Sequence, residues 1–372
     1  MRKYWIAAAA MIGACSGVRA GTYIPVPMVP GAVSEIVFSI NNHNVVAGSF
    51  RDSANVEHAF FGPLDGSNWT TFDAPFEGTT GTEARYINDH GAITGIALHP
   101  KFKVGEQFYR APDGTFSVFE KDGQPLDGIA QGMDSTDASV GDYLSTDGRT
   151  LGYIGQSGKY KKDFKLHLHG KGKFLQISPR GVSDSSGVIV GLFVDENGTR
   201  HGFWQNQFNG VATVVDYPDS QSRTAIEDMN QQSIFTGQWK ELSGDTHAFI
   251  LIYGRRIVDL DPKDGSASQQ AWGLNDNGLV ALSTSVGHSY IFCLKKYAGS
   301  CPDGGFTLRD RTHQWPSSPP TKSYSSVQNH ATPTESVHEP DGWIEGDPLN
   351  DIGRRYGMLL PGMGLDTRKG VQ

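Results

Sequence analysis

One phrase recurs along most of this chain, and that repetition constrains the fold more than any other feature. The phrase is an apolar residue, Asn or Asp, two variable residues, Gly, a short apolar stretch and a second Gly. It reads "INDHGAITG" from residue 87 and "LNDNGLVAL" from residue 274. At spacings of 45 to 49 residues, copies begin at Ile40, Ile87, Met133, Val182, Met229 and Leu274.

Each copy contains two more phrases, and together the three predict short strands joined by turns. The second phrase is "EHAFF" at 57–61 and "THAFI" at 246–250, and the third is "TTFDAP" at 70–75. Apolar runs such as "VIVG" have the length of a strand, and "NDHG" and "NDNG" are turn sequences in which Gly takes a positive φ. No stretch keeps a 3.6-residue period. We therefore expect about four antiparallel strands in each unit and no significant helix.

Four strands repeated at this spacing are typical of one blade of a β-propeller. A lone four-stranded sheet cannot bury both of its faces, whereas blades around an axis cover each other. Glycines recur inside the strand phrase at residues 48, 95, 141, 191 and 237. We expect Gly95, Gly191 and Gly237 to lie on a crowded inner strand, where a side chain would collide near the axis. An open solenoid is the alternative, although its repeats are usually shorter.

The two ends of the repeat region predict how the ring closes. Residues 23–28 resemble the end of the third phrase, so they read as the outer strand of a blade whose inner strands come from the last copy. This predicts six blades over residues 21–301, followed by a flexible Pro/Ser/Thr-rich excursion at 302–345. The remaining residues, 346–372, form a tail or a degenerate final repeat. Seven blades is the alternative, but Pro348 stands where an inner strand should run.

The N-terminus is typical of an exported protein. Arg2 and Lys3 precede a short apolar run, and "VRA" at 18–20 suits cleavage before Gly21, so residues 1–20 read as a signal peptide. "IGAC" at 12–15 also resembles a bacterial lipobox, in which Cys15 would carry a lipid anchor. The run is too short to span a bilayer, and no later segment is apolar enough to do so. We expect a secreted, periplasmic or outer-surface protein, with lipidation as the open question.

Charge and cysteine content narrow the partners and the compartment. Removing residues 1–20 would take away Arg2, Lys3 and Arg19 and no acid, so the net charge would move from −8 to −11. Such an acidic protein is a poor partner for nucleic acid. Cys293 and Cys301 form an even pair close in sequence, which in an exported protein predicts a local disulfide. Two free thiols are the less favoured alternative.

The sequence lacks the common catalytic and cofactor motifs. There is no G-x-S-x-G, H-E-x-x-H, P-loop, C-x-x-C or EF-hand loop. We therefore assign no catalytic residue, cofactor site or metal site. His167 and His169, in "LHLHG", would share one face of a strand and could hold a metal, but no third ligand is evident.

Several residues that recur from copy to copy are assigned structural roles. His58, His201, His247 and His288 occupy the same place in four copies, and residues repeated by blade are spread around a ring instead of meeting at one point. We expect each histidine to tie a strand to a turn through a carboxylate such as Asp89 or Asp276. The turn residues Asn88, Asp89, Asn275 and Asp276 are assigned structural roles as well.

"INDHGAITG" followed by "HAFF" and "FDAP" resembles the HAF repeats of bacterial extracellular proteins. The name comes from the His-Ala-Phe phrase, found here at 58–60 and 247–249, and the resemblance covers roughly residues 33–300. It is weaker at the third copy, "MDSTDASVG", and in the C-terminal tail. The resemblance implies an exported bacterial protein and implies no particular activity.

These observations favour a non-catalytic binding or scaffold protein. Its partner would be a surface protein or a polysaccharide, and the chain is expected to be a monomer. The main alternative is an extracellular polysaccharide-active enzyme with its site in the central funnel, and a further alternative is an adhesin or matrix component. The funnel distinguishes the first two: an enzyme should place ionisable residues there that break the repeat, whereas a scaffold should place repeated residues there.

Overall fold

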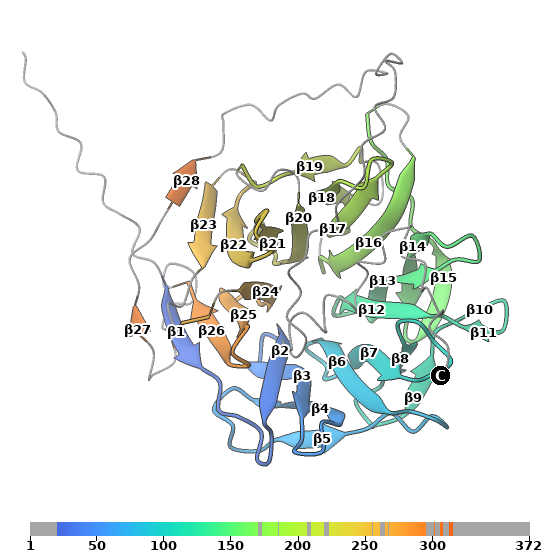
Figure 1. The fold of residues 1–372 in the computed structure, drawn as a ribbon, viewed down its shortest axis with the longest axis vertical. Helices are drawn as coiled ribbons and strands as arrows, with labels where there is room; N and C mark the ends of the chain where they lie inside the picture. Colours follow the sequence, from blue (N-terminus) through green and yellow to red (C-terminus); the bar gives the residue numbers. More distant parts are fainter. Residues whose placement is uncertain are drawn as a thin grey trace, which may run out of the picture.

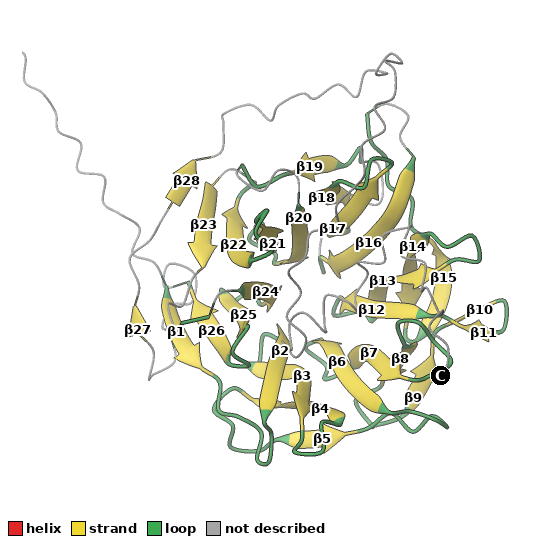
Figure 2. Ribbon diagram, viewed as in Figure 1, coloured by secondary structure: helices red, strands yellow, loops and turns green. Residues whose placement is uncertain are grey.

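The computed structural model of this protein is an all-β fold. It describes residues 21–314 with gaps at 170–172, 185, 207–209, 219–222, 255, 261–264, 267, 295–300, 302–305 and 308–311. Within those residues there are strands, turns and loops and no helix (Figure 2). The prediction of an all-β chain without significant helix is confirmed for this part. Residues 1–20, which include Cys15, and the residues beyond 314 lie outside the described residues.

The strands form four-stranded antiparallel units that lie around a common centre (Figure 1). Unit 1 comprises β2 (Ser34–Ile40), β3 (Val45–Arg51), β4 (Glu57–Pro63) and β5 (Thr70–Phe72). Unit 2 comprises β6 (Gly81–Ile87), β7 (Ile93–Leu98), β8 (Glu106–Arg110) and β9 (Phe116–Val118). Unit 3 comprises β12 (Gly128–Met133), β13 (Ala138–Leu144), β14 (Thr150–Gln156) and β15 (Lys159–Asp163).

The second half of the described chain repeats this arrangement. Unit 4 comprises β16 (Phe174–Val182), β17 (Val188–Asp195), β18 (Arg200–Asn206) and β19 (Thr213–Val215). Unit 5 comprises β20 (Thr224–Met229), β21 (Ile234–Lys240), β22 (Thr246–Ile252) and β23 (Arg256–Leu260). Unit 6 comprises β24 (Gln269–Leu274), β25 (Leu279–Thr284), β26 (Ser289–Cys293) and, from the start of the chain, β1 (Thr22–Pro25).

The remaining strands are short additions to these units. A small hairpin of two-residue strands, β10 (Glu120–Lys121) and β11 (Gln124–Pro125), lies in the chain between units 2 and 3. β27 (Phe306–Thr307) pairs with β1, and β28 (Thr312–Gln314) pairs with β23. Both of these last strands fall in the segment 302–345, which the sequence marks as a flexible excursion. They extend the sheets of units 6 and 5 at their outer edges.

The repeated phrase builds the turn between the first and second strands of each unit. Its fifth position, or its sixth in the copy that starts at Val182, has positive φ in all copies: 58° at Asn44, 82° at Gly91, 63° at Asp137, 61° at Gly187, 57° at Ser233 and 72° at Gly278. Gly adopts this region without cost, and Asn and Asp tolerate it because their side chains bond the local backbone. At Gly91 the prediction of positive φ from "NDHG" is confirmed.

Six apolar clusters form the core of the described residues, and each one lies between two neighbouring units. One contains Phe108 and Ala84 of unit 2 together with Ala59 of unit 1. Another joins Ile24 of β1 and Ile291 of unit 6 to Val37 of unit 1. Each unit therefore buries its two faces against the units on either side. This is the burial that a single four-stranded sheet cannot achieve alone.

A disulfide joins the end of β26 to the segment that follows it. Cys293 and Cys301 are bonded, as the sequence predicted, and the Cys293 side chain is fully buried. The bond closes a loop with a sequence separation of 8. We expect the Cys293→Ser/Cys301→Ser variant to lose about 2–3 kcal/mol of unfolding free energy, because the closed loop limits the unfolded chain. Urea titration with and without reductant checks this, and an equal midpoint in wild type under both conditions would contradict it.

A carboxyl group is buried where β1 leads into unit 1. The Val29 N–H donates to Glu35 Oε2 at 3.1 Å, whereas Glu35 Oε1 has no hydrogen-bond partner among the described residues. Burial raises the pKa of Glu35 to about 7, and the bond from Val29 opposes this rise. Because the pKa of Glu35 is higher in the folded than in the unfolded chain, the protonated carboxyl makes its full contribution to the unfolding free energy below about pH 4.5. That contribution is lost as the pH rises toward 7.

Glu35→Gln should remove this pH dependence. The amide oxygen can still accept the Val29 N–H but cannot ionise, so the variant should gain on wild type by on the order of 2–3 kcal/mol between pH 5 and pH 8. Urea unfolding at the two pH values measures the difference. The exposed Glu196→Gln in the β17–β18 turn is the matched control and should run parallel to wild type. A constant difference between Glu35→Gln and wild type across this range would contradict the prediction.

Candidate functional site

A bulge in the first strand of each of the six units directs one side chain toward the centre around which the units lie. The pairing between first and second strands shifts register between Val37 and Ser39, and at the equivalent place in the other units. Three positions before the turn Asn or Asp, or before Ser183 in unit 4, the residue left out of register is Phe38, Arg85, Gln131, Arg180, Glu227 or Trp272, and in unit 6 Gly273 is left out as well. A bulge re-aims a side chain while the strand continues on either side.

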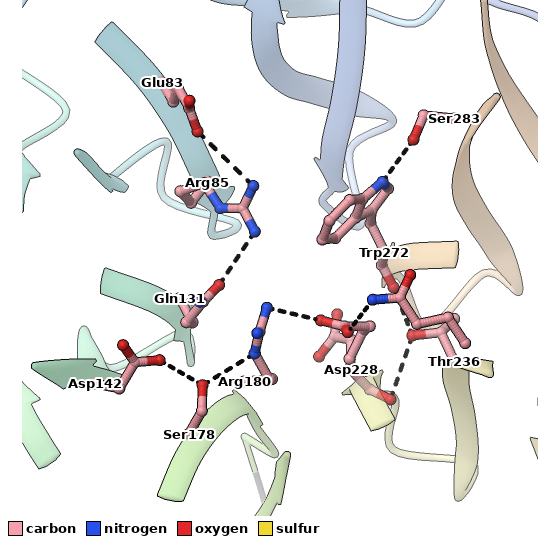
Figure 3. A network of polar contacts seen from close by, with 12 residues as sticks. Glu83, Arg85, Gln131, Asp142, Ser178, Arg180, Asp228, Thr236, Trp272 and Ser283 are labelled. Atoms are coloured by element: carbon pink, nitrogen blue, oxygen red, sulfur yellow. Dashed lines mark hydrogen bonds and ion pairs between the residues drawn. The ribbon is translucent and has the colours of Figure 1, made fainter. Parts of the chain in front are cut away.

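These axial residues break the repeat and contact one another. Arg180 Nη1 lies 3.2 Å from Glu227 Oε2, and both side chains are almost completely buried. Arg85 Nη2 donates to Gln131 Oε1 at 3.3 Å. Figure 3 shows Arg85, Gln131, Arg180 and Trp272 facing the same central space from their different units. We call this set, with the partners named below, the axial network.

Polar side chains of the neighbouring strands hydrogen-bond to Arg180 and Glu227. Arg180 Nε donates to Ser178 Oγ at 3.1 Å, and Ser178 in turn donates to Asp142. Gln238 Nε2 donates to Glu227 Oε1 at 2.7 Å. Hydrogen bonds to a buried ion pair compensate the loss of its hydration, which otherwise exceeds the Coulomb attraction.

Aromatic rings complete the surroundings of Arg85. Its guanidinium carbon lies 3.9 Å from the Phe38 ring centre and 4.9 Å from the Trp272 ring centre. Trp272 Nε1 donates to Ser283 Oγ at 2.7 Å, which fixes the indole. Arg85 thereby connects units 1, 2 and 6, because a guanidinium is attracted to the faces of aromatic rings.

Burial governs the protonation of the charged groups here. It lowers the pKa of Arg85 to about 10, with Glu83 opposing and Arg180 reinforcing the change, so Arg85 stays cationic at neutral pH. Burial raises the pKa of Asp142, while the charge of Arg180 and the bond from Ser178 oppose that rise. The network therefore holds permanent positive charges in a dry environment.

The other end of the axis carries the repeated turn residues. A depression of about 40 Å³ lies there, lined among others by Asn42, Asp89, Asp184 and Asp276, with Tyr86 also in the lining. This volume holds a few water molecules and is far below the 300–1,000 Å³ of a typical ligand pocket.

The turn residues link each unit to the next around this end. Asn88 Oδ1 accepts bonds within its own turn, and its Nδ2 donates to the Asp134 carbonyl of unit 3 at 3.2 Å. Asn275 Nδ2 donates to the Asn41 carbonyl at 2.9 Å, and Asp276 N–H to Asn42 Oδ1 at 2.7 Å. Asp89 accepts from the Asn42 N–H at 2.7 Å. These contacts run between neighbouring units, including units 6 and 1.

The repeated histidines lie away from the turn end, with partners other than those expected. His58 Nδ1 lies 2.9 Å from Asp73 Oδ1, and His201 Nδ1 lies 2.9 Å from Asp216 Oδ1. His247 Nε2 lies 3.0 Å from Glu241 Oε1. The expectation of Asp89 or Asp276 as partners was wrong. These histidines stand at the start of the third strand of their units. Asp73 and Asp216 follow the fourth strand, whereas Glu241 precedes the third strand. His288 is exposed at the corresponding place.

The glycines of the strand phrase are crowded within their own unit. A Cβ on Gly95 would lie 2.0 Å from the Glu83 carbonyl oxygen and 2.6 Å from Phe108 Cζ. A Cβ on Gly191 would meet the Ser178 carbonyl oxygen at 2.2 Å, and one on Gly237 would meet Phe249 Cζ at 2.5 Å. The crowding was predicted, but it arises from the bulged first strand and the aromatic of the third strand instead of from the axis.

His167 and His169 do not lie on a strand, since residues 164–169 form a loop between β15 and β16. Both are exposed, and the His167 N–H donates to Gln205 Oε1 at 2.7 Å. In the described part of the chain, no three His, Cys, Asp or Glu side chains come together in a way that could hold a metal ion. None of its segments is a helix that could span a membrane.

The axial network was not predicted from the sequence. Catalytic motifs and recurring residues do not include the axial position, because its residues differ from copy to copy. A signal is present in the sequence, since the column three residues before the turn reads Phe, Arg, Gln, Arg, Glu, Trp. Comparing copies for a polar, unlike column would have identified Arg85, Arg180 and Glu227.

Comparisons with known proteins give no family. No protein-family model matches the chain, and no curated protein matches it. Among solved structures, virginiamycin B lyase from Staphylococcus aureus is similar at 10% identity and a TM-score of 0.42, covering 73% of this chain and 98% of that one. A gluconolactonase from Xanthomonas campestris is similar at 8% identity and a TM-score of 0.41, covering 74% and 98%. TolB from Acinetobacter baumannii is similar at 11% identity and a TM-score of 0.42, covering 72% of this chain and 66% of that one. Nothing about function follows from likenesses at this level.

Proposed function

We propose that this protein is an exported, non-catalytic β-propeller of six blades that binds a partner outside the cytoplasm. The pairing of β1 with β26 and the bonds from Asn275 and Asp276 to unit 1 support a ring closed by the N-terminal strand. The leader-like residues 1–20 and the disulfide support export. The repeat phrases support a place among the bacterial HAF-repeat proteins.

The observation that carries the non-catalytic assignment is the closure of the axial network. Catalytic groups must reach a substrate, whereas Arg180 and Glu227 are buried and paired with each other, and Arg85 is buried against Gln131. They join units across the ring and so act as a structural plug. A propeller of this kind offers its loop-covered ends, and not its channel, to a partner, which would be a polysaccharide or a surface protein.

The experiment combines binding with turnover. The full chain is presented to a panel of neutral and acidic polysaccharides and to extracts of surface proteins, and the release of reducing ends is measured in parallel. We expect binding without release. Reducing ends released by wild type and not by a folded Glu227→Gln variant would overturn the proposal.

One observation favours the enzyme as the second candidate. Ionisable residues that break the repeat do lie at the axis, which is the arrangement expected of an active site in the funnel. Glycoside hydrolysis, however, needs two carboxylates placed on either side of the bond that is cleaved. Glu227 is held by Arg180 at 3.2 Å and Gln238 at 2.7 Å, so it is not placed to act on a substrate.

A further inference from the structure

The outermost strand of unit 3, β15, carries a row of exposed lysines (Figure 1). Lys159, Lys161 and Lys162 lie in this strand, and Lys165 lies two residues beyond its end. The pairing of β15 with β14 skips Lys161, and this bulge interrupts the alternation of the strand. As a result the neighbours Lys161 and Lys162 are both exposed. We call the four lysines the basic strip.

The basic strip is a feature of unit 3 and not of the repeat. The outer strands β5, β9 and β19 have three residues each and contain no lysine. The outer strands β1 and β23 are covered by β27 and β28. Lysines on an open edge hinder pairing with the strands of other chains. The three other open edges do without this protection, and Lys165 lies beyond the edge strand, so edge protection does not account for the strip.

The acidic residue within this segment is already neutralised. Asp163 is the only acid between residues 159 and 169. It accepts from Lys121 Nζ at 2.9 Å, from Tyr143 Oη at 2.7 Å and from Tyr160 Oη at 2.8 Å. These bonds tie β15 to β13 and to the β10–β11 hairpin. Among the described residues, none of the four lysines of the basic strip forms an ion pair.

The segment that follows β15 is fixed against unit 4. Phe164 and Leu166 are buried, whereas Lys165 between them is exposed. Gln205 of β18 holds the backbone here, since its Nε2 donates to the Lys165 carbonyl at 3.0 Å and its Oε1 accepts from the His167 N–H at 2.7 Å. The basic strip therefore lies on an ordered backbone, and a ligand that binds it has little chain to immobilise.

We infer that the basic strip binds the carboxylate or sulfate groups of an acidic polysaccharide that lies along the outer rim of unit 3. Lysine ammonium groups attract such anions as point charges. Residues 159 to 165 span about 20 Å of extended chain, so a linear polymer can contact several of these lysines at once. The net charge of −8 disfavours a flat anionic membrane or a long nucleic acid, which would also meet the acidic remainder of the surface.

The inference deepens the proposed function, because it rests on a polysaccharide partner and states the charge of the polymer and its place of contact. The strip starts next to one end of the ring, since the Ser157 N–H in the turn before β15 donates to the Asp137 carbonyl at 3.0 Å. A polymer bound along the rim does not enter the axis, which agrees with an axial network that serves only as a plug.

Binding of polygalacturonate and of neutral dextran to the full chain at low ionic strength tests the inference. We expect wild type to bind polygalacturonate, to bind it more weakly as salt is added, and to bind dextran much less tightly. Lys161→Gln/Lys162→Gln should weaken polygalacturonate binding by about tenfold, because two charges that face the polymer are removed. Lys101→Gln/Lys103→Gln is the matched control, since it removes two exposed lysines from the β7–β8 loop of unit 2. It should bind as wild type does.

The remaining arms separate the possible failures. Urea midpoints equal to that of wild type establish that both variants are folded, and Lys159→Gln/Lys165→Gln replaces the first variant if its midpoint falls. Polygalacturonate binding that is equal in wild type and the strip variant overturns the inference. An equal loss in the strip variant and the control also overturns it, because binding would then follow net charge alone.

Three further results overturn the inference in ways that bear differently on the proposed function. Dextran bound as tightly as polygalacturonate leaves a polysaccharide partner but removes the role of its charge. Double-stranded DNA bound more tightly than polygalacturonate at equal salt assigns the strip to another polyanion. Binding of neither polymer by a chain that captures a surface protein removes the inference and leaves the proposed function, whereas released reducing ends would count against the proposed function itself.

Discussion

Gly95→Ala should prevent this protein from folding stably. The new Cβ would lie 2.0 Å from the Glu83 carbonyl oxygen and 2.6 Å from the Phe108 ring, where atoms need more than 3 Å. The carbonyl belongs to the bulged backbone of β6, which cannot move away without breaking its pairing with β7. Overpacking alone costs about 1–3 kcal/mol and lost pairing adds to that, against a typical stability of about 5–15 kcal/mol. Yield of soluble protein and the urea midpoint measure the effect.

Gly91→Ala is the control for this prediction. Gly91 lies in the turn at the end of the same strand, with φ of 82° and no atom within 4 Å of an added Cβ. Its substitution costs only the strain of a positive φ, about 1 kcal/mol. A Gly95→Ala variant as stable as Gly91→Ala would show that the first strand can shift away, and that the bulge is not rigid.

Unit 6 supports the link between this glycine and the bulge. At the place of Gly95 it carries Leu282, and its first strand loses register over a longer stretch, between Ala271 and Leu274. The unit without this glycine is thus the one whose first strand departs most from the regular bulge, as expected when the glycine and the bulge depend on each other.

Much of the architecture could be predicted because the repeat encodes it locally. The turn at "NDHG", the strands on either side and the disulfide of Cys293 with Cys301 follow from turn chemistry, periodicity and residue spacing. The partners of His58 and His201 were not predictable in this way. Asp73 and Asp216 become their neighbours only through the pairing of the third and fourth strands, and that register depends on the whole unit.

The site was harder to predict for a similar reason. Arg180 and Glu227 are 47 residues apart, and neither belongs to a motif. What places them together is the bulge, which turns one residue of each first strand toward the axis. A bulge is a change in register between two strands, and no particular residue type marks its position in the sequence.

Breaking the Arg180–Glu227 pair is expected to have the second large effect. Among the described residues, Arg180→Ala would leave the buried Glu227 carboxylate with Gln238 as its donor, and Glu227→Ala would leave the guanidinium with Ser178. Removing one member of a buried ion pair costs about 3–5 kcal/mol, because the other charge stays dehydrated. Each single variant should lose that amount in urea unfolding, with an unchanged slope.

Replacing both members distinguishes a structural plug from a working site. Arg180→Met/Glu227→Leu removes both charges and fills the space with apolar atoms, so it should recover most of the stability lost by either single change. If the axial network only holds the units together, this variant should also keep partner binding at the surface. A stable double variant that no longer binds would instead place the ligand at the axis. A double variant as unstable as the two single losses combined would show that Arg180 and Glu227 act independently, which contradicts the coupling expected of a buried ion pair.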